Sequence, residues 1–208
     1  TVISPIFPFE VILFDVGGVL LTNGWDHRER ADVCARFSLD VDAFEARQPE
    51  PYDAWERGAI TARQYLDATI FYQPRSFTHD QFFAAICEQS VPLADGALGI
   101  LGELAASHKC MLGFMNNEAR ETNDYRFARF GLRQYIQVAL SSCYLGLRKP
   151  DAAIYRCALD ILGVPPERVL FIDDRQENVA GADSVGMKTI RFTGASALRP
   201  QLQSLGVL

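Results

Sequence analysis

The sequence has few cysteines and histidines, and their spacing does not match that of a metal site. The five cysteines are scattered over 208 residues, at Cys34, Cys87, Cys110, Cys143 and Cys157. The three histidines also lie far apart. This scatter argues against a disulfide framework and against a zinc site, and it predicts buried free thiols in a reducing cytoplasm.

Long apolar runs and basic clusters are missing as well. No apolar stretch is long enough to span a membrane, and the first residues lack the basic-then-apolar pattern of a signal peptide. The net charge of −6, without a run of basic residues, argues against binding to nucleic acid or to an anionic membrane. We therefore expect a cytoplasmic protein with no nucleic-acid or membrane partner. The sequence leaves the oligomeric state open.

The composition is otherwise that of an ordinary globular protein, with 49% hydrophobic and 22% charged residues. Five short apolar runs predict β-strands at 11–16, 110–115, 138–141, 169–172 and 188–192. Helical patterns separate or follow them at 97–107, 123–130, 151–162, 179–185 and 197–205. This alternation predicts an α/β fold, with a Rossmann-like parallel sheet and helices on both of its faces.

A long segment without a convincing strand separates the first two predicted strands. It contains amphipathic patterns that predict helices at 28–37, 41–46, 62–72 and 80–89. Proline and glycine interrupt these patterns, at Pro49, Pro51, Gly58 and Pro74. We predict an α/β core formed by residues 1–24 and 92–208, and a small all-helical cap, residues 25–91, inserted after the first strand. Such an insert would lie over the carboxyl ends of the sheet.

Reactive side chains follow three of the predicted strands. Asp15 ends the first strand, and Gly17 and Gly18 after it let a ligand approach the backbone. Lys149 precedes a helix, and a pair of aspartates, Asp173-Asp174, ends the fourth strand. Each has an ordinary alternative, such as a solvated lysine or a helix-capping pair. Their common position at strand ends favours a metal-assisted phosphoryl-transfer site, because clustered carboxylates repel unless a hard cation such as Mg²⁺ lies between them.

Four motifs together resemble the haloacid dehalogenase-like superfamily. They are Phe14-Asp15-Val16-Gly17-Gly18-Val19-Leu20, Met115-Asn116-Asn117, Gly146-Leu147-Arg148-Lys149-Pro150-Asp151 and Phe171-Ile172-Asp173-Asp174-Arg175-x-x-Asn178. The stretch 55–61, Trp-Glu-Arg-Gly-Ala-Ile-Thr, is similar to the helix-turn-helix of the family's helical cap. The resemblance covers nearly the whole chain and is to subfamily IA, in a variant whose fourth motif is Asp-Asp.

Most members of this superfamily are Mg²⁺-dependent phosphatases, so the resemblance implies a hydrolase for a small phosphorylated metabolite. It implies that Asp15 is the nucleophile and that the metal is held by Asp15, the backbone carbonyl of Gly17, and Asp174. Asp173 would be a further ligand or lie just outside the ligand set, and Asn178 would orient metal-bound water. The implied phosphate-binding residues are Asn116, Asn117 and Lys149. Two cap residues, Trp25 and Arg57, are candidate specificity residues.

The sequence departs from the family pattern at two positions. Gly17 stands where most phosphatases of the family have a second aspartate, which protonates the leaving group and then activates water. Asn116 stands where Ser or Thr is usual, although its amide can still donate a hydrogen bond to a phosphoryl oxygen. Because general acid–base help contributes about 10²–10⁴-fold, the loss at position 17 matters.

Three functions are compatible with a glycine at position 17. The first is a phosphatase for substrates with good leaving groups, such as anomeric sugar phosphates. The second is a catalytically weak relative that binds a phosphorylated ligand or a protein. The third is a 2-haloacid dehalogenase, which also lacks the second acid. Metal-free attack on carbon has no use for the extra carboxylates, and a binding protein would not need Lys149 and Asp174. We therefore rank the phosphatase first and the dehalogenase third.

Overall fold

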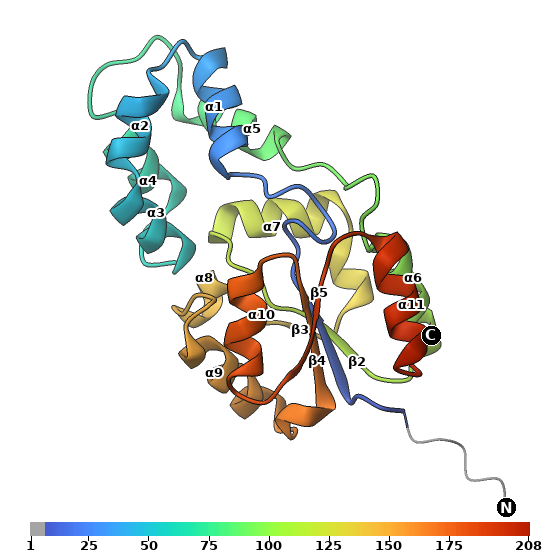
Figure 1. Ribbon diagram of the computed structural model, residues 1–208. Helices are drawn as coiled ribbons and strands as arrows, with labels where there is room; N and C mark the ends of the chain where they lie inside the picture. Colours follow the sequence, from blue (N-terminus) through green and yellow to red (C-terminus); the bar gives the residue numbers. More distant parts are fainter. Residues whose placement is uncertain (1–6) are drawn as a thin grey trace, which may run out of the picture.

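A five-stranded parallel sheet forms the centre of the molecule (Figure 1). The computed structural model describes residues 7–208. The strands are β1 (Val11–Phe14), β2 (Met111–Phe114), β3 (Val138–Ala139), β4 (Val169–Asp173) and β5 (Lys188–Arg191). Their order in the sheet is β3-β2-β1-β4-β5, with every pair parallel. The predicted α/β class and the Rossmann-like parallel sheet are therefore confirmed.

Helices cover both faces of the sheet. Successive side chains of β1 point to opposite sides and all are apolar, so both faces need a helical layer to bury them. Ile12 and Phe14 pack with residues of α6 (Leu98–Ser107) and α11 (Ala195–Ser204). Val11 and Leu13 pack with residues of α9 (Ala152–Leu162) and α10 (Gln176–Asp183). Full burial of each such side chain stabilises the fold by about 1.5–3 kcal/mol, which fixes the central strand firmly. The other helices of this part are α7 (Arg120–Arg129), η1 (Leu132–Tyr135), α8 (Ser142–Leu145) and η2 (Pro166–Arg168).

The segment between β1 and β2 is helical, and Figure 1 shows most of it beyond one end of the sheet. Its helices are α1 (His27–Arg36), α2 (Val41–Arg47), α3 (Pro49–Glu56), α4 (Ala62–Thr69) and α5 (His79–Glu88). Residues 25–91 contain no β-strand. These helices share an aromatic-rich core that includes Trp25, Trp55, Tyr65 and Phe82. The exact division into a core and a cap, at residues 24 and 91, stays a prediction; below, "cap" means helices α1–α5 with Trp25 and Asp26.

Helix α3 differs from the expectation that its prolines would interrupt the helical pattern. It begins at Pro49, directly after Gln48. A proline in the first turn of a helix is tolerated because the N–H that it lacks would have no partner there. The prolines therefore start a helix, and this helix carries Asp53 and Glu56, whose carboxylates contact Arg148.

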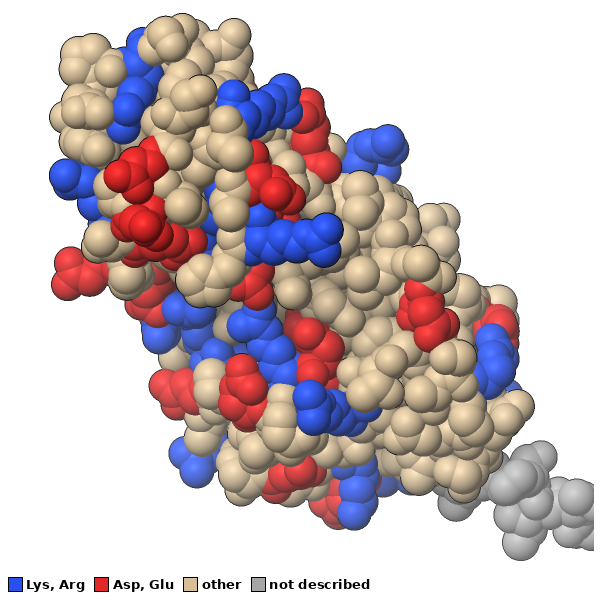
Figure 2. Space-filling model, turned by 45° about the horizontal axis from the view of Figure 1, so that its top comes forward, with Lys and Arg blue, Asp and Glu red and all other residues tan. Residues whose placement is uncertain are grey.

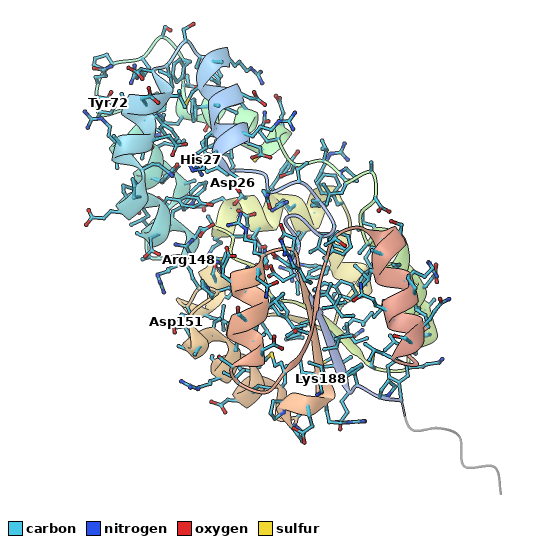
Figure 3. All side chains as sticks on the ribbon, viewed as in Figure 1. Asp26, His27, Tyr72, Arg148, Asp151 and Lys188 are labelled. Atoms are coloured by element: carbon cyan, nitrogen blue, oxygen red, sulfur yellow. The ribbon has the colours of Figure 1, made fainter. Side chains whose placement is uncertain are left out.

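Ion pairs join the cap to the sheet domain. Arg148 contacts two carboxylates of α3, with Nη1 2.6 Å from Asp53 Oδ1 and Nη2 2.5 Å from Glu56 Oε2. Arg175 Nη2 lies 2.9 Å from Asp26 Oδ2. Figure 3 shows Asp26 and Arg148 at the junction of the two parts, whereas Tyr72 lies at the far end of the cap. The polar contacts hold the cap over the carboxyl ends of the strands.

The outer surface in Figure 2 shows basic and acidic side chains interspersed over the cap and the junction. A broad area with few charged side chains lies over the sheet domain, below and to the right of the cap in this view. Among the described residues, no helix combines the length and the apolar character needed to cross a bilayer.

The turn between α3 and α4 makes a close backbone contact with α8, and a substitution in this turn can test that contact. Gly58 has a φ of +70°, and a Cβ there would clash with the carbonyl of Cys143 in α8. Gly146 has the same φ of +70°, but nothing lies within 4 Å of the position of its Cβ. We expect Gly146→Ala to cost about 1–2 kcal/mol through backbone strain alone.

Gly58→Ala should cost about 1–3 kcal/mol more than Gly146→Ala, because the new methyl group also forces α8 and the turn apart. The free energies of unfolding of both variants in urea measure the difference. Equal losses in the two variants would show that the turn does not rest on α8.

Candidate active site

The pairing of β1 with β4 brings two of the predicted aspartates together. Phe14 lies opposite Ile172, and the amide N–H of Asp15 donates to the carbonyl of Ile172 at 2.8 Å. Asp15 and Asp173 therefore lie side by side where the two strands end. Both are buried, at 7% and 0% exposure.

Lys149 lies between these two carboxylates. Its Nζ is 3.1 Å from Asp15 Oδ2 and 2.6 Å from Asp173 Oδ2. The side chain of Asn117 fixes the lysine backbone from both sides, because its amide donates to the Lys149 carbonyl at 2.8 Å and its oxygen accepts from the Lys149 N–H at 2.9 Å. The second, third and fourth sequence motifs thus meet the first at one point.

Three carboxylates are close enough to share a cation. Ligand oxygens of Asp15, Asp173 and Asp174 lie within 4.8 Å of one another. Asp173 is already occupied, since it accepts from Lys149, from the Asn178 amide at 3.0 and 3.1 Å, and from the backbone N–H of Arg175 at 2.8 Å. Asp174 Oδ1, in contrast, is buried without a hydrogen-bond partner.

The donor set therefore fits a hard divalent cation at Asp15 and Asp174, with Asp173 as support. Oxygen ligands suit Mg²⁺, and a buried carboxylate oxygen normally has a partner. A side chain at Gly18 would clash with the Asp174 carboxylate, so the glycine keeps this position accessible. Gly17, whose carbonyl is the predicted third ligand, lines the same cavity as Asp15.

Burial sets the ionisation of the cluster. Burial raises the pKa of Asp15 to about 8, against the opposing effect of Lys149 and with help from Asp173 and Asp174. Burial also raises the pKa of Asp174, with the charge of Asp173 adding to it. Burial alone would lower the pKa of Lys149, but Asp15 and Asp173 together raise it, so the ammonium stays charged. A bound cation would favour the ionised form of both free carboxylates.

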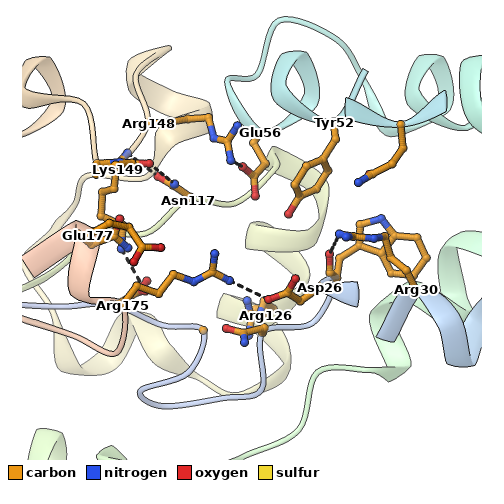
Figure 4. A pocket seen from close by; sticks show the side chains of 17 residues that line it. Asp26, Arg30, Tyr52, Glu56, Asn117, Arg126, Arg148, Lys149, Arg175 and Glu177 are labelled. Carbon is orange, nitrogen blue, oxygen red and sulfur yellow. Dashed lines mark hydrogen bonds and ion pairs between the residues drawn. The ribbon is translucent and has the colours of Figure 1, made fainter. Parts of the chain in front are cut away.

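A polar cavity of about 270 Å³ lies over this cluster. Figure 4 shows Tyr52 and Glu56 entering it from the cap, opposite Lys149, Arg175 and Arg126 from the sheet domain. The remaining charged residues along its wall are Asp26, Arg30, Arg148 and Glu177. A small polar ligand would therefore meet charged groups on all sides of the cavity.

The sequence pattern of the haloacid dehalogenase-like hydrolases matches residues 9–186. The chain belongs to this family. Flavin mononucleotide hydrolase 1 of Arabidopsis thaliana is 28% identical over 200 residues, covering 95% of this chain and 78% of its own length. Pyrimidine 5'-nucleotidase of Escherichia coli is 30% identical over 191 residues, covering 86% and 83%. Bifunctional epoxide hydrolase 2 of Rattus norvegicus is 41% identical over 213 residues, but this chain spans only 37% of its length.

Solved structures share the fold. A family enzyme of Bacteroides thetaiotaomicron in complex with magnesium and inorganic phosphate has a TM-score of 0.74 at 19% identity, covering 89% of this chain and 95% of its own. A predicted family hydrolase of Porphyromonas gingivalis has a TM-score of 0.75 at 22% identity, covering 95% and 98%. At these identities the likeness shows the fold of the family and nothing finer.

Two family positions are arranged differently from the simplest expectation. The Asn116 side chain does not line the cavity. Its amide donates to Asn123 Oδ1 at 2.9 Å, and its oxygen accepts from the Ser141 hydroxyl at 2.7 Å. Asn178 directs its amide at Asp173. Phosphate binding by Asn116, and orientation of metal-bound water by Asn178, stay predictions that these hydrogen bonds do not favour.

The two candidate specificity residues also differ in their placement. Trp25 lines the cavity but is only 3% exposed, and its indole N–H donates to the Tyr65 hydroxyl at 2.9 Å. Arg57 is not among the residues along the cavity. It donates to Asp53 at 2.8 Å and to the carbonyl of Gly146 at 3.2 Å, so it joins the cap to the sheet domain.

Several residues that line the cavity were not predicted as site residues from the sequence, and Arg30, Tyr52, Glu56 and Arg126 are among them. Arg30 lies in a stretch that resembles an exposed helix start, yet it is 4% exposed and contacts Glu45 and the carbonyl of Trp25. The signal that was available is the spacing on α3, where Tyr52 and Glu56 are four residues apart and so share one helix face.

The divalent-cation site can be tested by calorimetry. We expect Mg²⁺ to bind the wild-type chain and to raise its Tm, and Asp174→Asn to weaken the binding by at least about tenfold, as loss of a charged ligand does. The affinity of the wild type should rise from about pH 6 to about pH 8, because protons compete with the cation for Asp15, whose pKa is about 8.

The matched control is Asp160→Asn, which removes the same charge from the exposed face of α9. Unchanged Mg²⁺ affinity in Asp174→Asn would show that Asp174 is not a ligand.

Proposed function

We propose that the chain is a Mg²⁺-dependent phosphatase that acts on small phosphorylated metabolites through an aspartyl-phosphate on Asp15. One observation carries the proposal. Asp15 and Lys149 line a polar cavity, and the unpartnered oxygen of Asp174 belongs to the carboxylate cluster that includes Asp15. The relatives named as a mononucleotide hydrolase and a nucleotidase support a phosphorylated substrate.

The chain's own residues suit the first chemical step. Asp15 Oδ1 accepts the N–H of Val16 at 2.7 Å, which fixes the orientation of the carboxylate and leaves Oδ2 beside the Lys149 ammonium. An oxygen of Asp15 forms a bond to phosphorus, while the ester bond breaks and its electron pair stays on the leaving oxygen. Lys149 neutralises charge on the phosphoryl group as it transfers. Mg²⁺, when bound at Asp15 and Asp174, would supply further neutralisation of the phosphoryl oxygens.

Water then attacks phosphorus, which releases phosphate and restores Asp15. Position 17 cannot assist either step, because glycine carries no proton donor or acceptor on its side chain. The barrier for expelling a poor leaving group therefore stays high. The leaving group of an aryl, acyl or anomeric phosphate needs little protonation to depart. We infer that the substrate belongs to this class of esters with a low leaving-group pKa, such as an anomeric sugar phosphate.

A series of aryl phosphates tests this function. With Mg²⁺ present, kcat/KM should fall steeply as the pKa of the leaving phenol rises, and Asp15→Asn should abolish turnover. Asp160→Asn, on the exposed face of α9, serves as the charge-matched control.

Other results would identify a different function. A flat series would show that another group supplies the proton. Failure to turn over any phosphate ester would favour a ligand- or protein-binding module. Release of halide from 2-haloacids without metal would favour a dehalogenase.

A further inference from the structure

The buried polar atoms that have no hydrogen-bond partner gather around one cavity. Among residues 7–208, the buried side-chain nitrogens and oxygens in this state are Arg126 Nε, Arg148 Nε, Asp174 Oδ1 and Glu56 Oε2, of which only Glu56 Oε2 lies in an ion pair, 2.5 Å from Arg148 Nη2. Three of these residues line the cavity over Asp15, and the fourth belongs to the carboxylate cluster beneath it. Buried polar groups normally have partners, so a polar ligand in this cavity would meet groups that the protein itself leaves without a hydrogen bond.

Arg126 lies beside Gly17, the position at which most phosphatases of the family have the second aspartate. It extends from α7 and is 2% exposed. A Cβ at Gly17 would lie 3.8 Å from Arg126 Nη1, and a Cβ at Gly24 would lie 3.6 Å from the same nitrogen. The guanidinium therefore packs against the segment where family members carry the second aspartate, and it lines the same cavity as Asp15 and Lys149.

The position of this guanidinium is fixed. Nη1 lies 2.5 Å from Glu118 Oε2, and Nη2 donates to the carbonyl of Thr22. Glu118 is itself held by the Thr122 hydroxyl at 2.6 Å. Arg126 is thus a preorganised cation, and Glu118 balances its charge without blocking every donor, because Nε remains without a partner.

We propose that Arg126 compensates in part for the missing acid by stabilising the negative charge on the leaving-group oxygen. This inference rests on the proposed phosphatase function. When Asp15 bonds to phosphorus, the ester bond breaks toward the leaving oxygen, and the guanidinium attracts the charge that develops there. Arg126 keeps its own proton, since a guanidinium does not deprotonate in proteins, and the departed oxygen takes its proton from water.

The test compares leaving-group series for the wild type and Arg126→Gln. Loss of one preorganised donor to a developing oxyanion costs about 10²–10³-fold in rate. We expect a loss of this size for alkyl phosphates and a much smaller loss for aryl phosphates with acidic phenols, so that the slope against leaving-group pKa becomes steeper. Arg126→Lys, which keeps the charge, should recover part of the slope.

Arg120→Gln is the matched control, because Arg120 lies on the same helix, contacts the Cys143 carbonyl and does not line the cavity. It should keep the wild-type slope. An equal rate loss for all substrates in Arg126→Gln, with the slope unchanged, would overturn the inference and leave the phosphatase function standing. No turnover of any phosphate ester by the wild type would overturn both.

Gly17→Asp gives an independent result if Arg126→Gln does not fold. Position 17 has an ordinary φ, and its Cβ would meet Asn23 Oδ1 at 3.2 Å, a tight contact with a side-chain oxygen. The new carboxylate would pair with Arg126 and withdraw it from the leaving oxygen. We therefore expect slower turnover of alkyl phosphates in Gly17→Asp. Faster turnover would show that position 17 simply lacks an acid and that Arg126 has no such role.

Discussion

The ammonium of Lys149 between two buried carboxylates is the interaction on which the rest of the site depends. Asp15 and Asp173 are adjacent because β1 and β4 pair in register, and burial penalises their charges. Without a cation between them, the ends of two central strands would repel each other. Lys149 supplies that cation, and Asn117 fixes its backbone through two hydrogen bonds. The same ammonium therefore stabilises the ends of the two strands and lies beside the predicted nucleophile, Asp15.

The same turn of the chain connects this chemistry to the cap. Arg148 precedes Lys149 directly, and it points in the other direction, toward Asp53 and Glu56 of α3. Movement of the cap away from the sheet would break these ion pairs and expose the turn that carries Lys149. Burial of Asp15 and Lys149 lowers the effective dielectric around them, which strengthens each electrostatic contact with a ligand. Adjacent residues therefore contact the cap, through Arg148, and the buried carboxylates, through Lys149.

The sequence predicted the sheet, and the edge where Asp15 and Asp173 lie, because both depend on local patterns. Short apolar runs that end in Asp15 or Asp173 identify strands and the edge at which they meet. The ligand-facing side of the cap was not predictable in the same way. Which face of a short helix turns inward depends on tertiary packing, so Arg30 resembled a solvated residue and Arg57 a ligand-facing one, and both are placed otherwise.

Arg126 illustrates a second limit. It lies in a strongly polar helix, where an arginine usually faces solvent, and its burial depends on Glu118 and on two glycines distant in the chain. A missing side chain at Gly17 is visible in the sequence, but the cation that fills the neighbouring space is visible only in three dimensions.

The most direct test of the account is to find where the phosphoryl group is held during turnover. The enzyme is mixed with Mg²⁺ and an aryl phosphate, quenched in acid, digested and measured by mass spectrometry. The account predicts a phosphorylated peptide that contains Asp15, in high yield because Gly17 provides no base to hydrolyse the acyl-phosphate, and its absence in Asp15→Asn. Phosphate release without any phosphorylated peptide, or with the phosphoryl group on another residue, would contradict it.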